Sequence, residues 1–287
     1  MIDSPFLARH WALAHGRRLD LGPRGLIMGV LNVTTDSFSD GGLFATGESA
    51  VAQAERMISE GASIIDIGGE STRPNADPVT AVAEQARVLP VVEALAGRID
   101  VVISVDTYRA ETARLAVAAG AHIINDVWGL QREPGIARVA ADTGAGLVAM
   151  HTGRERTKLP DPIADQLSFL ARSVAIAREA GIGDDRILLD PGFGFAKETA
   201  RENLELMARF GELRSLGFPL LVGTSRKRFL GELTNRLPAD RDVATAATTV
   251  ILRLAGAAVF RVHDVATNAD ALAVADAMVE QGMRASP

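Results

Sequence analysis

The chain of 287 residues contains no cysteine. This excludes disulfide bonds, thiolate catalysis and cysteine zinc sites, and it is compatible with a reducing compartment. Aromatic residues make up only 5%, and no apolar run approaches the length of a transmembrane helix. The first twenty residues mix arginine and histidine with single apolar residues, so they lack the apolar core of a signal peptide. We therefore expect a cytoplasmic protein.

Basic residues are also in the minority. Lysine and arginine number 30 against 36 acidic residues, which gives a formal charge of −6. This balance argues against a nucleic-acid partner and against an acidic membrane surface, although a small basic pocket can still lie within an acidic protein. Hydrophobic residues make up 47% of the chain, enough for a full globular core.

Short aliphatic runs that end in a polar residue recur eight times, over residues 26–31, 63–67, 101–105, 122–125, 146–150, 187–190, 219–223 and 259–263. Stretches with helical spacing lie between them, at 47–60, 78–96, 109–119, 134–143, 165–180, 199–216 and 243–254. Buried strands that alternate with helices must run parallel. The pattern predicts an α/β fold, a single (β/α)₈ TIM barrel at residues 25–287 with an N-terminal hairpin or cap at residues 1–24. An open doubly wound sheet is the alternative that spacing leaves open.

In a barrel, the residues that close the strands form the active-site face. Asp106, Asn125 and Asp190 all stand at such strand ends. Two carboxylates and an amide match a heterocycle that presents amino, ring N–H and carbonyl groups, because carboxylates accept and an amide can both donate and accept. Three separate helix caps are the competing interpretation, and we favour the shared site.

Basic residues point to a phosphate site at the same face. Period two sends Arg261 and His263 to one side of the last strand, and Lys227 and Arg73 stand in loops that follow other strands. Together they would form a positive cluster sufficient for a pyrophosphate. A solvated basic loop and a hydrogen-bonded core histidine are the plainer interpretations. No zinc motif, phosphate loop, serine-hydrolase elbow or dinucleotide fingerprint is present.

Taken together, the loops resemble dihydropteroate synthases of folate biosynthesis. The resemblance rests on Gly29-Val-Leu-Asn-Val-Thr-Thr-Asp-Ser-Phe-Ser-Asp-Gly-Gly, Asp66-Ile-Gly-Gly-Glu-Ser-Thr-Arg-Pro, Ser104-Val-Asp-Thr, Ile124-Asn-Asp-Val, Asp190-Pro-Gly-Phe-Gly-Phe, Ser225-Arg-Lys and Arg261-Val-His. These motifs span nearly the whole chain. The resemblance implies a TIM barrel that joins 6-hydroxymethyl-7,8-dihydropterin diphosphate to p-aminobenzoate and releases pyrophosphate through a dissociative mechanism. It also implies inhibition by sulfonamides and a homodimer built on the last helices.

The same resemblance implies a role for each residue that matches a family motif. The pterin would contact Asp106, Asn125, Met150, Asp190, Phe195 and Lys227, and the diphosphate would contact Asn32, Arg73, Arg261 and His263. The p-aminobenzoate would lie against Phe38, Pro74, Lys227 and Arg228, where Arg228 replaces a serine common in the family. The residues expected nearest the reaction are Asp40, Phe38, Lys227 and Asp106. Asn32 would help to hold Mg²⁺, a hard cation that prefers oxygen ligands.

Two other functions compete with this one. A methyltetrahydrofolate:corrinoid methyltransferase would share the pterin pocket but has no need of the diphosphate cluster. A non-catalytic pterin-binding paralogue has no need of the loop residues Asn32, Phe38, Asp40 and Arg73, all of which are present. We expect Mg²⁺-dependent synthase activity, with neither nucleic acid nor membrane as a partner.

Overall fold

Eight parallel strands close into a barrel in the computed structural model, which describes residues 4–33, 43–70 and 79–285. They are β3 (Leu26–Asn32), β4 (Ile64–Gly68), β5 (Val102–Asp106), β6 (Ile123–Asp126), β7 (Gly146–Met150), β8 (Ile187–Asp190), β9 (Leu221–Val222) and β10 (Val259–Val262). Their order in the sheet is β8-β7-β6-β5-β4-β3-β10-β9. The N–H of Leu189 donates to the carbonyl of Pro219 at 3.1 Å and joins the two ends. The predicted barrel is confirmed, and the open sheet is excluded.

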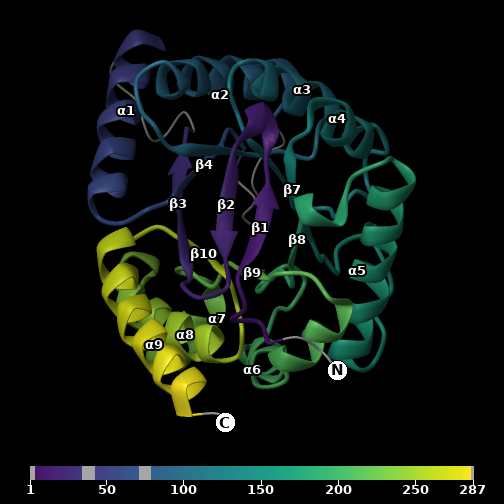
Figure 1. Cartoon of the computed structure of the whole chain (residues 1–287), viewed down its shortest axis with the longest axis vertical. Helices are drawn as coiled ribbons and strands as arrows, with labels where there is room; N and C mark the ends of the chain where they lie inside the picture. The colour runs from purple at the N-terminus through teal and green to yellow at the C-terminus, as the bar shows by residue number, and fades with distance from the viewer. Residues whose placement is uncertain (1–3, 34–42, 71–78, 286–287) are drawn as a thin grey trace.

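Helices form a ring around these strands (Figure 1). They are α1 (Leu43–Ser59), α2 (Ala81–Ala96), α3 (Ala110–Ala118), α4 (Gly135–Thr143), α5 (Pro162–Glu179), α6 (Ala200–Ala208), α7 (Arg228–Thr234), α8 (Asp242–Leu254) and α9 (Val265–Ala285). The helix expected over 199–216 is interrupted at Arg209, whose backbone leaves helical geometry at φ −103° and ψ 12°. The chain continues as a 3₁₀ segment, Phe210–Leu216, that contains the poor helix former Gly211.

Polar side chains start several of these helices. Thr199 and Glu202 form a capping box at α6, in which the N–H of Glu202 donates to Thr199 Oγ1 at 3.2 Å and the N–H of Thr199 donates to Glu202 Oε2 at 3.1 Å. Asp161 caps α5 by accepting from the N–H of Ala164 at 2.9 Å, without a reciprocal side-chain bond. Such caps satisfy backbone donors that have no partner within the helix. They set where each helix begins relative to the loop before it.

An antiparallel hairpin of β1 (Arg9–Ala12) and β2 (Arg18–Leu21) covers the end of the barrel at which the strands begin. Figure 1 shows it across the middle of the ring. Trp11, Leu13 and Leu21 pack there against inward side chains of the barrel strands. The indole of Trp11, 1% exposed, donates to the carbonyl of Arg186 at 3.0 Å. The hairpin therefore seals one end and leaves the other for a site.

Alternation along the strands produces two layers of core. Outward residues such as Phe260 and Val262 pack under the helices, whereas inward residues such as Met28 and Val259 fill the barrel above the hairpin. Nearer the carboxyl ends the inward positions become polar, at Asp66, Asn125 and Arg261. Burying polar groups is costly unless they are paired, so this change marks the functional end of the barrel.

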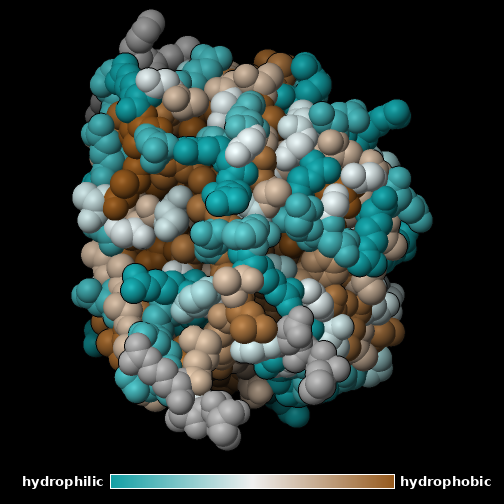
Figure 2. Space-filling model, in the orientation of Figure 1, coloured by the Kyte–Doolittle hydropathy of each residue, from teal (hydrophilic) through white to brown (hydrophobic). Residues whose placement is uncertain are grey.

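Figure 2 shows hydrophilic residues across the hairpin face with hydrophobic patches between them. Within the part of the chain that the structure describes, no helix has both the length and the apolarity that crossing a membrane requires.

Candidate active site

Arg261 lies at the centre of the barrel mouth, between two carboxylates. Its Nε donates to Asp66 Oδ2 at 2.6 Å, and one of its terminal nitrogens donates to Asp106 Oδ2 at 2.9 Å. The three residues come from β10, β4 and β5, and their order in the sheet brings them together. The prediction that Arg261 faces the site is consistent with this geometry, although its partners here are carboxylates.

Asn125 joins the same network from β6. Its Nδ2 donates to Asp66 Oδ2 at 3.2 Å, and its side chain is buried. Asp66 itself has no exposed surface. In the sequence Asp66 stands out only as the first residue of a family motif, and no role is suggested for it, because its partners lie 59 and 195 positions further along the chain.

The opposite wall of the mouth is formed by the loop after β8 and by the start of α7. Asp190 closes β8 and accepts from the N–H of Gly192 at 2.7 Å. Lys227 directly precedes α7, and its ammonium lies 4.2 Å from the centre of the Phe195 ring. Phe195 in turn packs in a small apolar cluster with Met150. Asp106, Asn125, Asp190 and Lys227 thus converge with the two predicted apolar walls.

Burial sets the protonation behaviour of these groups. It raises the pKa of Asp106 to about 7, an effect that Arg261 opposes and Asp66 reinforces. Burial also raises the pKa of Asp190 to about 6. The pKa of Lys227 falls to about 8, through burial and then the nearby charge of Arg261. Burial lowers the pKa of Arg261 as well, but the carboxylates outweigh it and raise that pKa above its ordinary value. Perturbed groups gathered in one concavity are typical of a functional site.

Three further predicted residues lie around this centre. His263 follows β10, and its Nδ1 lies 2.9 Å from Ser225 Oγ. Asn32 ends β3 with an exposed side chain, next to Gly68. The side chain of Arg228 is 82% exposed, and its Nε lies 3.1 Å from a carboxylate oxygen of Glu232 one turn along α7. Phe38, Asp40, Arg73 and Pro74, predicted for the first two loops, lie outside the described residues.

A buried network that the sequence did not suggest supports the Phe195 loop. The ammonium of Lys197 donates to the carbonyl of Gly192 at 2.8 Å and contacts His151 Nδ1 at 3.1 Å. His151 Nε2 in turn lies 2.9 Å from Asp165 Oδ2. Burial lowers the pKa of Lys197 to about 7 and that of His151 to about 3. The position of Lys197 directly after an apolar, glycine-rich loop was a sequence signal that this lysine could be buried. Sequence spacing does not indicate its partner.

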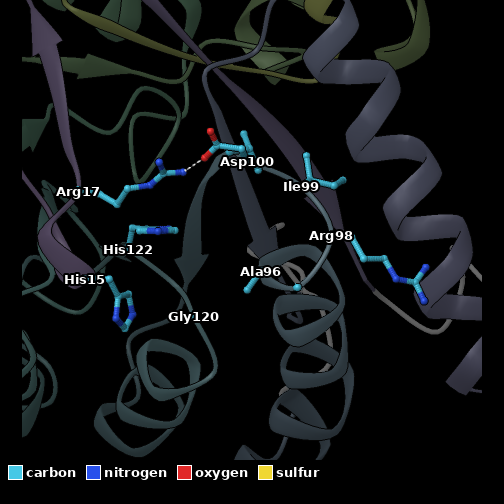
Figure 3. A pocket seen from close by; sticks show the side chains of 10 residues that line it. His15, Arg17, Ala96, Arg98, Ile99, Asp100, Gly120 and His122 are labelled. Carbon is cyan, nitrogen blue, oxygen red and sulfur yellow. Dashed lines mark hydrogen bonds and ion pairs between the residues drawn. The ribbon is translucent and has the colours of Figure 1, made fainter.

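A hollow of about 420 Å³ lies at the other end of the barrel. His122 and Val101, which line it, directly precede β6 and β5, so it opens where the strands begin. Its charged groups are already paired: Arg17 with Asp100 (Figure 3), and Arg98 with a glutamate of α1. Because its charges neutralise one another, the barrel mouth is the better candidate for chemistry.

Asn32 is the candidate metal ligand of the barrel mouth. Across residues 4–33, 43–70 and 79–285, no three His, Asp or Glu side chains are grouped so that they could hold an ion. The amide oxygen of Asn32 is still a suitable oxygen donor at the mouth. Mg²⁺ commonly takes only one or two protein ligands and completes its shell with water and substrate phosphates, so this donor fits such an ion.

Known proteins share this architecture. A family model for pterin binding enzymes matches residues 28–263. A dihydropteroate synthase from Bacillus subtilis is 47% identical over 257 residues, which are 90% of each chain. A crystal structure of the Clostridium difficile dihydropteroate synthase, in the presence of pteroic acid, superposes with a TM-score of 0.88 at 41% identity and covers 91% of this chain and 98% of that one. The Xanthomonas albilineans enzyme with 4-aminobenzoic acid has a TM-score of 0.86 at 43% identity and covers 99% and 100%. The chain therefore belongs to the dihydropteroate synthase family of pterin-binding enzymes.

Proposed function

We propose that this protein is a transferase that condenses 6-hydroxymethyl-7,8-dihydropterin diphosphate with p-aminobenzoate, giving 7,8-dihydropteroate and pyrophosphate. The observation that carries the proposal is the set of acceptors in the mouth, Asp106, Asn125 and Asp190, beside the cations Lys227 and Arg261. A ring with a guanidine-like edge needs the acceptors, and an anionic leaving group needs the cations. Relatives at this level of identity carry the same activity in their names.

Each wall of the site has a part in holding the pterin. Asp190 and Asp106 accept from the amino and ring N–H groups, while Lys227 donates to the ring carbonyl side. Met150 and Phe195 exclude water from the faces of the ring, since both are buried apolar side chains. This desolvation strengthens every polar contact around the ring.

The diphosphate would lie toward Arg261 and His263, and Arg73 from the second loop would join them. Asn32 would hold Mg²⁺, which supplies charge neutralisation to the departing pyrophosphate when it is bound. Arginine and histidine meet the charge that develops as the carbon–oxygen bond breaks, and the carboxylates of the mouth stabilise the cationic methylene that remains. Asp40 would lie near that methylene, and no protein nucleophile takes part.

The arylamine then attacks. Phe38 and Pro74 would close over the ring of p-aminobenzoate, while Lys227 and Arg228 supply positive charge for its carboxylate. The exposure of Arg228 at the start of α7 is consistent with a contact made at the rim of the site. The overall reaction forms one C–N bond and breaks one C–O bond, and the amine proton is released.

Product formation tests the proposal. Purified protein should release pyrophosphate and form dihydropteroate only when both substrates and Mg²⁺ are present. Arg261→Ala should weaken binding of the diphosphate substrate more than binding of a free pterin. Methyl transfer from methyltetrahydrofolate would favour the corrinoid-type alternative. Pterin binding without any product would favour a non-catalytic paralogue.

We also propose that each chain consists of an N-terminal cap, residues 1–24, and a barrel, residues 25–287. Two such chains form a homodimer. The support is a set of exposed apolar side chains on the neighbouring helices α8 and α9, namely Ile251, Leu254, Val274 and Met278, which are 45–64% exposed. Apolar surface of this kind on adjacent helices is typical of subunit contacts. Sedimentation of the pure protein should give twice the monomer mass.

A further inference from the structure

Asp66 lies beneath the proposed pterin site and contacts two of its residues. It stands in the middle of β4, with no exposed surface. Its Oδ2 accepts from Arg261 Nε at 2.6 Å and from Asn125 Nδ2 at 3.2 Å. In the sheet, β4 is separated from β10 by one strand and from β6 by another. A single oxygen thus links two walls of the mouth across the barrel interior.

The bond to Asp66 determines which end of the Asn125 amide a ligand meets. An asparagine side chain offers an acceptor oxygen and a donor nitrogen. Since Nδ2 donates to Asp66, Oδ1 is the end left for the mouth. Among the residues that the structure describes, nothing donates to this oxygen. Asn125 therefore presents an acceptor, and it selects a ligand that offers an N–H at that point.

Asp66 also fixes the plane of the Arg261 guanidinium. Nε is held by Asp66, and one terminal nitrogen is held by Asp106 at 2.9 Å. Hydrogen bonds to two carboxylates leave the planar guanidinium group little freedom to rotate. The other N–H groups of the guanidinium remain available for substrate.

The second oxygen of Asp66 supplies an independent observation. Among the described residues, neither this buried Oδ1 nor the buried hydroxyl of Ser104 has a hydrogen-bond partner. The two residues pair in register on β4 and β5, so their side chains lie on the same face of the sheet. Buried polar atoms in proteins nearly always have a partner, so two orphans side by side mark a place for a water molecule or a ligand N–H below the ring.

We propose that Asp66 is a positioning residue for pterin recognition, which turns the oxygen of Asn125 toward the ring and holds Arg261 in the plane that its substrate requires. This inference rests on the proposed function and deepens it, because it names what orients the ligand-contacting groups. Asp66 acts through these two residues and is not itself required to touch substrate.

Asp66→Asn is the central test, because it removes the charge with little change of shape. Calorimetry with 6-hydroxymethylpterin should show Kd at least tenfold higher than for the unmodified protein, and the KM for p-aminobenzoate should stay within twofold. Asp126→Asn is the matched control: Asp126 is also a buried aspartate, but it caps the turn after β6 by accepting from Trp128 and Leu130. The control should bind the pterin within twofold of the unmodified protein. Equal affinity of Asp66→Asn and the unmodified protein overturns the proposal.

The orientation of the amide has its own test. Asn125→Asp should weaken pterin binding at least tenfold, because it puts two carboxylates in contact. The exchange variant, Asp66→Asn with Asn125→Asp, restores an N–H and an acceptor between the two positions and should recover at least fivefold over Asn125→Asp. No recovery means that Asp66 does not orient the amide.

Thermal melts establish that each variant is folded. If Asp66→Asn does not fold, Asn125→Asp alone still decides, since unchanged affinity there contradicts the proposed contact. The proposed function fails separately, through absence of product from the unmodified protein with both substrates.

Discussion

Replacing Asp190 by asparagine should make the ligand-free protein more stable at pH 8 and less able to bind a pterin. Asp190 is 5% exposed, and burial raises its pKa from 3.8 to about 6. A carboxylate whose folded-state pKa lies above its unfolded value stabilises the fold only while it can hold its proton. That contribution is complete below pH 3.8 and is lost as the pH rises through 6.

The magnitude follows from the size of the shift. A rise of about two pKa units corresponds to about 3 kcal/mol of lost stability above pH 7, about 1.5 kcal/mol at pH 5 and about 0.5 kcal/mol at pH 4. The asparagine introduced at this position would still accept from the N–H of Gly192. Its new amide donors need partners, and this requirement reduces the gain in stability by about 1 kcal/mol. Asp190→Asn should therefore gain about 2 kcal/mol at pH 8, or about 3 °C in Tm for a chain of this length.

Urea unfolding at pH 4.5 and pH 8 measures the difference, and Asp165→Asn is the opposite control. Burial acts on Asp165 too, but hydrogen bonds from His151 and Arg156 outweigh it and hold its pKa below the ordinary value. Its contribution is present above pH 3.8 and disappears as the pH falls through the folded pKa, so Asp165→Asn should lose stability at pH 8. An Asp190→Asn variant that is no more stable than the unmodified protein at pH 8, or equally stabilised at both pH values, refutes the reasoning.

Three further expectations concern other parts of the molecule. The affinity for free pterin, measured by calorimetry from pH 5 to 9, should fall below pH 7 as Asp106 takes up a proton and above pH 8 as Lys227 loses one; a flat profile contradicts the assigned contacts. Lys197→Met should raise the KM for the pterin substrate about tenfold and lower kcat by a smaller factor. Lys158→Met is the control, because Lys158 is a more exposed lysine that also bonds the Phe195 loop, and it should change KM less than twofold. Equal effects of the two substitutions would contradict a supporting role for the buried Lys197. Trp11→Ala should cost about 3–5 kcal/mol in urea unfolding, and the pterin Kd should be unchanged because the hairpin closes the opposite end; a large change in Kd would connect the hairpin to the site.

The barrel was predictable because its signals are local. A strand buried on both faces reads as a continuous aliphatic run, and all eight runs coincide with strands. The run at 219–223 shortens to Leu221–Val222, and Pro219 at its start has no N–H to donate to a neighbouring strand. Helix α7 escaped prediction because it spans seven residues, too few to show a helical period.

The site was only partly predictable, because sequence patterns report local structure and several site contacts join residues far apart in the chain. Period two along single strands indicates which residues face inward, and the structure brings Asp106, Asn125 and Asp190 together in the mouth as that pattern predicts. The partners of Asp66 and Lys197 are set by barrel closure and loop packing, not by spacing. His151 and Lys197 lie 46 positions apart and meet only because two loops fold toward each other.

The charges in the mouth explain how an acidic protein can hold an anionic substrate. With every group ionised, Asp66, Asp106 and Asp190 carry three negative charges against the two positive charges of Lys227 and Arg261. A diphosphate that entered alone would meet carboxylates, two of which already engage Arg261. A bound pterin ring changes this, because its N–H donors engage the carboxylates and reduce their hold on the guanidinium. Arg261 has five N–H groups and donates two hydrogen bonds to carboxylates. It can therefore bind the carboxylates and a phosphate at the same time. Ring and diphosphate are then bound by one connected network, and their contributions to affinity should exceed the sum of the two parts measured separately.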